Sequence, residues 1–334
     1  MTAQYLRNLS LVVANPAGQG LELGALRCVF EVRRGDTQTP NSCDVRVYNT
    51  STDTSNRLYS PEFTQLMLRV GYQDQQLQQI FAGSIKQVRK GREDQKNSYV
   101  AITAAEGDQA YNYAALAITL AKGATPTDVI SGIIKQMATA ALATPTGGSG
   151  GQVVQPGYLP QLTSNAYQRG RTVYGMCRDE LRELVGANDC TWFIQGNQLD
   201  VVPLTGYVPE PPILLTPSTG LIGVPEQTQN GLMMRVLINP AIKIGRVVKL
   251  DYSDINQYRY GLDVHSVGAN LQLARSTTRL SPSGLYYVLR VEHFGDTRGL
   301  QWYSDLTCLS VDAEIPTNTL PQAAILPGGA VPRY

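Results

Sequence analysis

Two stretches of the sequence consist of short apolar runs with alternating polar residues, and a stretch of different character lies between them. Such runs, rich in Val, Ile, Tyr and Thr and separated by turn residues, are typical of β-strands. In the first stretch they cover residues 26–33, 43–48, 66–72, 80–88 and 98–103, with a short helix expected after Asn49. In the second they cover residues 231–238, 246–252, 285–293 and 302–311. The chain is therefore predicted to be mainly β.

The middle stretch combines helix and strand signals. Thr125-Pro126-Thr127-Asp128 is typical of a helix start, because Thr125 can accept a bond from a backbone N–H, Pro126 fits the first turn and Asp128 favours the positive end of the helix dipole. Ile130, Ile133, Ile134 and Met137 then share one face. A second helix is predicted over residues 172–185, with Gly186 as its end. Its apolar side comprises Val173, Met176, Cys177, Leu181 and Leu184.

A predicted hairpin and two uncharged segments help to divide the chain into parts. Gly196-Asn197, flanked by apolar runs, predicts a β-hairpin. Residues 136–168 carry no charge and contain the flexible sequence Gly-Gly-Ser-Gly-Gly at 147–151, and residues 315–332 are also uncharged. We therefore predict four parts: a β-domain over 1–106, an α+β insert over 107–215, a second β-domain over 216–312 and an extended tail over 313–334. Each β-domain is expected to be a small barrel or sandwich.

The two β-rich stretches repeat a set of short motifs in the same order. Arg46-Val47-Tyr48-Asn49 is followed by an apolar run at 68–72, and then by Gly91 with Tyr99 eight residues later. Arg235-Val236-Leu237-Ile238-Asn239 is followed by a run at 248–252, and then by Gly295 with Tyr303 eight residues later. The second copy is longer between its run and its glycine. A duplicated domain and a chance match of short motifs both fit this pattern.

Composition narrows the classes of function. Charged residues make up 16% of the chain and the net charge is +1, whereas soluble domains typically carry about 25% charged residues. This balance argues against a protein that grips nucleic acid through phosphates and against a disordered chain. It indicates that much of the surface meets protein rather than water, and the 18 Tyr fit such interfaces.

The cysteines and the apolar runs predict the environment of the chain. The five cysteines (Cys28, Cys43, Cys177, Cys190 and Cys308) are widely spaced without a CxxC pair, so we expect reduced, mostly buried thiols. No run approaches the ~20 apolar residues that span a bilayer, and residues 1–20 do not form a signal peptide. Assembly in a cytoplasm is expected.

No constellation with catalytic chemistry emerges, so neither an enzyme nor a cofactor or metal site is predicted. The sequence at 147–151 matches GxSxG only formally, because a nucleophile elbow needs a strand before it and a helix after it. His293 with Asp296 could form a base and its orienting carboxylate, but a strand end and a turn explain them better. Glu106 and Asp108 are candidates for the carboxylate pair that a glycan-cleaving enzyme would need, but nothing in the sequence orients them.

Lys86, Arg89, Lys90 and Arg92 form a compact basic cluster in a predicted hairpin whose tip covers residues 89–94. Three interpretations fit this cluster: contact with a protein partner, contact with nucleic acid, or a solvated tip. Glu93 and Asp94 dilute its positive field, which weighs against nucleic acid.

Several further motifs carry a resemblance to a known family. Residues 219–228, together with Leu237-Ile238-Asn239-Pro240, Gly245 and the segment from Tyr286 to Trp302, resemble the baseplate hub proteins of tailed bacteriophages, the tail-tube-like hubs of the late control gene D type. Residues 34–41 and 45–51 look like the opening strands of the same family. The similarity covers about residues 5–312, and its motifs are structural.

The resemblance implies a ring. In such hubs each subunit carries two domains similar to the tail-tube protein, and three subunits form a pseudo-sixfold ring that joins the sixfold tube to the threefold spike. It implies a homotrimer in the virion tail baseplate, with the tail tube, spike, tape-measure and other baseplate proteins as partners and DNA only in transit. Another tail-tip or distal tail adaptor and, in a different class, a glycan-acting tail enzyme with Tyr-rich sugar contacts are the alternatives.

Overall fold

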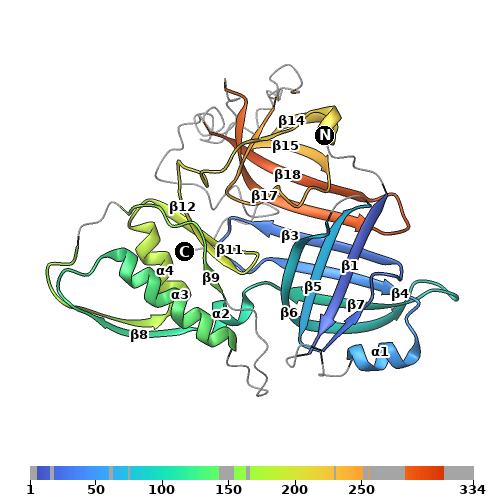
Figure 1. Cartoon of the computed structure of the whole chain (residues 1–334), viewed down its shortest axis with the longest axis horizontal. Coiled ribbons are helices and arrows are strands. Elements are labelled where there is room, and N and C mark those ends of the chain that lie inside the picture. Colours follow the sequence, from blue (N-terminus) through green and yellow to red (C-terminus); the bar gives the residue numbers. More distant parts are fainter. Residues whose placement is uncertain are drawn as a thin grey trace, which may run out of the picture.

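The structure, a computed structural model, describes residues 6–15, 19–59, 63–73, 76–142, 154–162, 166–228, 231–250, 255 and 283–311. The expected tail over 313–334 and the glycine-serine segment at 147–151 lie outside the described residues, as do positions 251 and 252 of the strand predicted at 246–252. Figure 1 shows two groups of strands and a third group that contains most of the helices. The prediction of a mainly β chain with an α+β insert is confirmed.

We name three parts by their elements. The first β unit comprises β1 (Arg7–Ala14), β2 (Gly20–Glu22), β3 (Cys28–Gly35), β4 (Ser42–Tyr48), α1 (Thr52–Tyr59), β5 (Gln65–Tyr72), β6 (Gln78–Arg92) and β7 (Ser98–Ala105). The insert comprises α2 (Asp108–Tyr113), β8 (Ala115–Leu120), α3 (Pro126–Leu142), β9 (Gln155–Pro156), β10 (Arg171–Met176), α4 (Cys177–Gly186), β11 (Cys190–Gln195) and β12 (Gln198–Pro203). The second β unit comprises β13 (Ile213–Leu214), the 3-10 helix η1 (Pro217–Thr219), β14 (Leu221–Thr228), β15 (Gly231–Leu237), β16 (Val247–Lys249), β17 (Leu285–Asp296) and β18 (Trp302–Ser310).

The two β units form one continuous 13-stranded sheet. Its main order is β14-β15-β18-β17-β3-β4-β7-β6-β5-β1-β2, with β16 beside β17 and β13 beside β16. The units meet where the second half of β17 pairs antiparallel with β3, from Arg290 opposite Gly35 to Asp296 opposite Val29. Backbone hydrogen bonds therefore cross from one unit to the other without a break.

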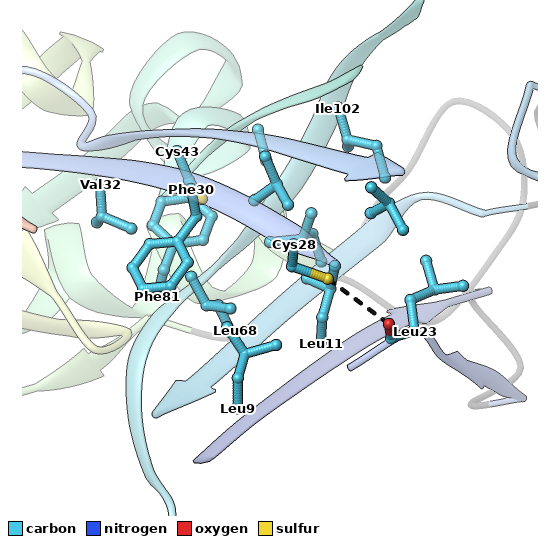
Figure 2. Packing of buried hydrophobic residues seen from close by; sticks show 14 of the residues in the cluster. Leu9, Leu11, Leu23, Cys28, Phe30, Val32, Cys43, Leu68, Phe81 and Ile102 are labelled. Atoms are coloured by element: carbon cyan, nitrogen blue, oxygen red, sulfur yellow. Dashed lines mark hydrogen bonds between the residues drawn. The ribbon is translucent and has the colours of Figure 1, made fainter. Parts of the chain in front are cut away.

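The core of the first β unit follows from the period of its strands. Alternate residues of β3 are buried, and so Cys28, Phe30, Val32 and Arg34 point inward. Figure 2 shows Cys28, Phe30 and Val32 packed among side chains from β1, β5 and β6, with the Cys28 thiol donating to the Leu23 carbonyl at 3.6 Å. All five cysteines are free and buried, as predicted. Trp302 and Ile238 of the second unit complete this core, so the two units share buried surface.

The insert has its own core and corrects one helix prediction. Helix α3 begins at Pro126 as predicted, although Asp128 is the acceptor: its carboxylate receives the Thr125 N–H at 2.7 Å and the Thr125 hydroxyl at 2.8 Å. The helix predicted over 172–185 is wrong for its first residues. Residues Arg171–Met176 form β10, paired with β8, because Thr172, Val173 and Tyr174 alternate in exposure and favour extended backbone. Gly186 is the last residue of α4, and the left-handed turn comes at Asp189 (φ 52°).

The two β units share their strand order. In the first the order is β3-β4-β7-β6-β5, and in the second it is β14-β15-β18-β17-β16, so each strand has a counterpart in the same sequential position. The register also agrees: Arg46 lies opposite Ala101 and Tyr48 opposite Tyr99, while Arg235 lies opposite Asp305 and Leu237 opposite Tyr303. The motif repeat in the sequence thus corresponds to a structural repeat.

An irregularity in the ladder recurs at the same position. The β6–β7 ladder shifts between Ile85 and Gln87, and the β17–β18 ladder shifts between Val288 and Arg290. In both units the residue after this bulge lies opposite a threonine, Thr103 or Thr307. The glycines of the motif are offset by one position, because Gly91 lies opposite Tyr99 whereas Phe294, not Gly295, lies opposite Tyr303.

Candidate assembly surface

One side of the sheet is turned away from the cores and carries charged residues from both units. We call it the polar sheet face. Residues that lie directly opposite each other in the ladders share this face, for example Arg235, Asp305, Glu292 and Arg33 across β15, β18, β17 and β3. Along the main strand order from β14 to β6, its charged residues are Glu31, Arg33, Asp44, Arg46, Arg89, Glu226, Arg235, Arg290, Glu292 and Asp305.

The same arginine–tyrosine contact occurs on this face in both units. The Arg46 guanidinium lies 5.5 Å from the centre of the Tyr99 ring, and the Arg235 guanidinium lies 4.0 Å from that of Tyr303. Arg46 and Arg235 occupy equivalent positions, as do the two tyrosines. Arginine stacked on an aromatic ring keeps its charge while it covers apolar surface.

Most charges of the polar sheet face are balanced by near neighbours. Arg235 forms a two-pronged ion pair with Asp305, with N–O distances of 2.7 and 2.9 Å. Arg33 pairs with Glu31 at 2.5 Å, and Arg290 pairs with Glu292. The Thr103 hydroxyl donates to Asp44 at 2.6 Å. A face with matched charges presents little net field to a polyanion.

The predicted basic cluster lies in strand β6 rather than at a hairpin tip. β6 extends to Arg92, and the tip covers residues 93–97. Burial lowers the pKa of Lys86, whose ammonium is paired with Asp108 of α2. Lys90 donates to Asn56 of α1 at 2.7 Å. Arg89 is on the polar sheet face, opposite Ala101, whereas Lys90 and Arg92, opposite Val100 and Ser98, are on the other side of the sheet, so the four cations do not form a single patch.

The carboxylate of Glu106, a candidate catalytic group from its residue type, instead anchors the insert. Glu106 is fully buried at the end of β7 and accepts the Asn41 side-chain amide at 2.8 Å and the Gly196 N–H at 2.7 Å. Asn41 also donates to the Ile194 carbonyl at 2.8 Å. The β11–β12 hairpin is thereby fixed to the first β unit, and Asp108 is held by Lys86 instead of facing Glu106 across a cleft.

Asp36 joins all three parts. It follows β3 and is 9% exposed, and its two oxygens accept the Thr191 hydroxyl of β11 and the Tyr287 hydroxyl of β17, each at 2.9 Å. Burial raises the pKa of Asp36 to about 7, although the two hydroxyl donors act in the opposite direction. Asp36 lies in the segment 34–41 that carries the family resemblance, but its linking role was not predicted, because its partners lie more than 150 positions away.

His293 and Asp296 have separate structural partners. The fully buried His293 shares a hydrogen bond between its Nδ1 and the Ser304 hydroxyl at 2.7 Å, and burial together with nearby Arg34 lowers its pKa to about 3. Asp296 pairs with Arg27 at 2.8 Å. The arrangement therefore does not form a base with an orienting carboxylate.

Comparison with solved structures shows what this fold is similar to. The tail protein from Neisseria meningitidis MC58 superimposes with a TM-score of 0.52 at 10% sequence identity, covering 92% of this chain and 97% of that one. The 43 kDa tail protein of prophage MuSo2 from Shewanella oneidensis gives a TM-score of 0.54 at 6% identity, covering 92% and 98%. This chain has the fold of phage-type tail proteins.

Sequence comparison adds no relative. No protein-family model matches the chain, and no curated protein matches it. The described residues contain no cluster of three or more His, Cys, Asp or Glu side chains that could hold a metal ion. Among the same residues no helix is long and apolar enough to cross a membrane.

Proposed function

We propose that this protein is a structural baseplate hub of a phage tail. Three chains would form a ring that joins the sixfold tail tube to the threefold spike and encloses a passage for the tape-measure protein and DNA. The ring would have no reaction of its own, and its place would be the virion baseplate, after assembly in the host cytoplasm. The tail tube, spike, tape-measure and other baseplate proteins would be its partners.

The observation that carries this proposal is the repeat of strand order, register and bulge position in the two β units. Three chains with two equivalent units present six similar surfaces, which is a physical way to match a sixfold partner on one side and a threefold partner on the other. The fold of tail proteins supports the same assignment. On this proposal, residues 1–106 and 216–312 are the two tube-like domains, 107–215 is an insert and 313–334 is a tail.

The polar sheet face is the proposed lining of the passage. Four of its five arginines, Arg33, Arg46, Arg235 and Arg290, are paired with carboxylates or stacked on tyrosines, and a passage for DNA must not retain it. A basic excess would instead create phosphate contacts with strong salt dependence. A face with matched charges is therefore better suited to let DNA pass than to bind it.

Native mass spectrometry tests the copy number. Three chains of 36.4 kDa should give a species of roughly 109 kDa for a closed ring, either at high protein concentration or after addition of a spike protein. Light scattering on the same samples provides an independent mass. A strict monomer under all of these conditions would contradict the hub assignment, and a different closed number would favour another tail adaptor.

A further inference from the structure

Strand β6 of the first unit lacks the second neighbouring strand that its counterpart in the second unit, β17, has. β6 and β17 are counterparts, and beyond the bulge β17 has β18 on one side and β3 on the other. In the described part of the chain, β6 from Gln87 to Arg92 pairs with β7 alone. No described strand therefore occupies, beside this half of β6, the position that β3 occupies beside β17; helix α1 contacts β6 there through Lys90, which is on the other side of the sheet from Arg89.

The counterpart of β3 lies at the other end of the sheet. β14 is the outermost strand in the order of the described strands, and it pairs with β15 as β3 pairs with β4. Glu226 and Glu31 occupy equivalent positions, opposite Met233 and Asp44.

We infer that β6 of one copy pairs antiparallel with β14 of a second copy, in the register that β17 and β3 use within the chain. That register places Arg89 opposite Thr228 and Gly91 opposite Glu226, so Arg89 and Glu226 become diagonal neighbours on one face. The contact is head-to-tail, because each copy supplies a different strand to each side, and it closes into a ring when the rotation allows.

Charges favour this pairing over its alternatives. Within the chain, Glu292 of β17 lies opposite Arg33 of β3. Between copies, Arg89 of β6 would approach Glu226 of β14, again as opposite charges. Pairing of β6 with β3, or of β17 with β14, would first have to break the ladder that β3 and β17 form within the chain. It would also bring like charges together, Arg89 with Arg33 or Glu292 with Glu226. Like charges across a ladder are unfavourable. First and second units are therefore expected to alternate around the assembly.

The shape of β14 limits the paired run. The β14–β15 ladder shifts between Ile222 and Glu226, and Pro225 within that segment has no N–H to donate. We expect the ladder between copies to centre on residues 89–91 and 226–228. Such bulges and prolines also discourage unspecific pairing at sheet edges.

A disulfide test reads this register directly. In the full-length chain carrying Arg89→Cys and Thr228→Cys, directly opposite residues would come within reach of a disulfide. Mild oxidation should give covalent dimers and trimers on a non-reducing gel. The native cysteines are all buried, so either single variant should give little cross-linking. The matched control, Lys90→Cys with Thr228→Cys, places one thiol on the opposite side of the sheet and should give no more than the singles.

The outcomes separate this inference from the proposed trimer on which its ring size rests. Cross-linking that stops at the trimer supports both. Cross-linking that stops at another number, or continues into long polymers, supports the strand pairing and contradicts the trimer. A native trimer without cross-links above the single variants overturns the pairing and leaves the trimer standing. A monomer that does not cross-link at high concentration overturns both.

Charge exchange provides a second measurement that needs no oxidation. Arg89→Glu or Glu226→Arg alone should weaken association by roughly tenfold, and the double variant should regain most of it. Both positions are exposed, so circular dichroism should show folded protein in each case. Equal losses in the single and double variants would overturn the diagonal contact.

Discussion

The two β units follow the same plan of five strands, but they have different surroundings. The first unit adds β1, β2 and α1, and its core includes Trp302 and Ile238 from the second unit. The second unit has a separate, smaller core and a short β16 that lies beside β13 in parallel. What the units share is register, bulge position and the arginine–tyrosine contact. The units differ in the strand that lies beside β6 and beside β17: beyond the bulge, β17 pairs with β3, whereas β6 has no such partner among the described strands.

This difference shows where the repeat is constrained and where it is free. Strand register sets which side chains enter the core, because a shift by one residue exchanges the two faces. Connections and outer strands carry no such constraint, and there the two units differ. The β17–β3 ladder, the shared core and the contacts of Asp36 make one body from the two units, so they are expected to unfold together.

The largest expected effect comes from equivalent core positions. Ile102 and Leu306 are both 1% exposed, and replacement of either by Ala should lower the free energy of unfolding by about 2–5 kcal/mol. Denaturation followed by circular dichroism and by the fluorescence of Trp192 and Trp302 should give one coincident transition in both variants. Separate transitions, in which the second unit of Leu306→Ala unfolds before the first, would contradict the expectation that the two units unfold together.

Asp36 tests the contact between the units through pH. Its pKa of about 7 in the folded chain lies above its value in the unfolded chain, so the protonated form stabilises the fold. That contribution is complete below about pH 4 and is lost as the pH rises through 7. Relative to Asp36→Asn, the wild type should lose up to about 4 kcal/mol between pH 4 and 8. Parallel pH curves from chemical denaturation would show that Asp36 is not buried as described.

The two motif glycines provide a smaller, matched comparison. A Cβ at Gly295 would lie 2.2 Å from the ring of Phe30, which is buried and packed on Trp302. A Cβ at Gly91 would lie 2.5 Å from the ring of Tyr99, which is partly exposed and can turn away. Gly295→Ala should therefore cost about 1–3 kcal/mol, and Gly91→Ala less. Thermal melts would measure both, and equal losses would contradict the difference in packing.

The smallest effects are expected on the polar sheet face. Arg235→Ala removes an ion pair with Asp305 and a contact with Tyr303, whereas Arg46→Ala removes only the contact with Tyr99. Because Arg235 has 48% of its side chain exposed, its loss should cost no more than about 1 kcal/mol, and that of Arg46 less. Urea denaturation would show which of the two variants loses more free energy of unfolding. A loss of several kcal/mol at either position would mean that this face is not solvent-lined in the free chain.

The sequence predicted the elements whose signal is local. Strands β3 to β7 of the first unit, the start of α3 and the Gly196-Asn197 hairpin follow from periodicity and turn chemistry, which act over a few residues. Strands β1 and β2 were not among the predicted strands. The repeat was also visible, because Arg46 with Tyr99 and Arg235 with Tyr303 mark equivalent register positions. Strand β10 was missed, since Val173 and Cys177 also fit a helical face and only the pairing with β8 decides between the two structures.

The contacts between parts could not be predicted in the same way. Glu106 and Asp36 are carboxylates whose partners lie far along the chain, and no local pattern distinguishes them from surface residues. The basic cluster illustrates the opposite error. Four cations close in sequence suggested one patch, but strand alternation and the bulge in β6 separate them: Lys86 pairs with Asp108, Lys90 donates to Asn56, and Arg89 is on the polar sheet face.

Electron microscopy of the assembled protein, viewed along the ring axis, tests the central claim most directly. Averaged images should show six similar densities around a central opening, alternating between two slightly different shapes with strict threefold symmetry. Particles with three densities, with six densities that do not alternate, or with an open helical arrangement would contradict the account.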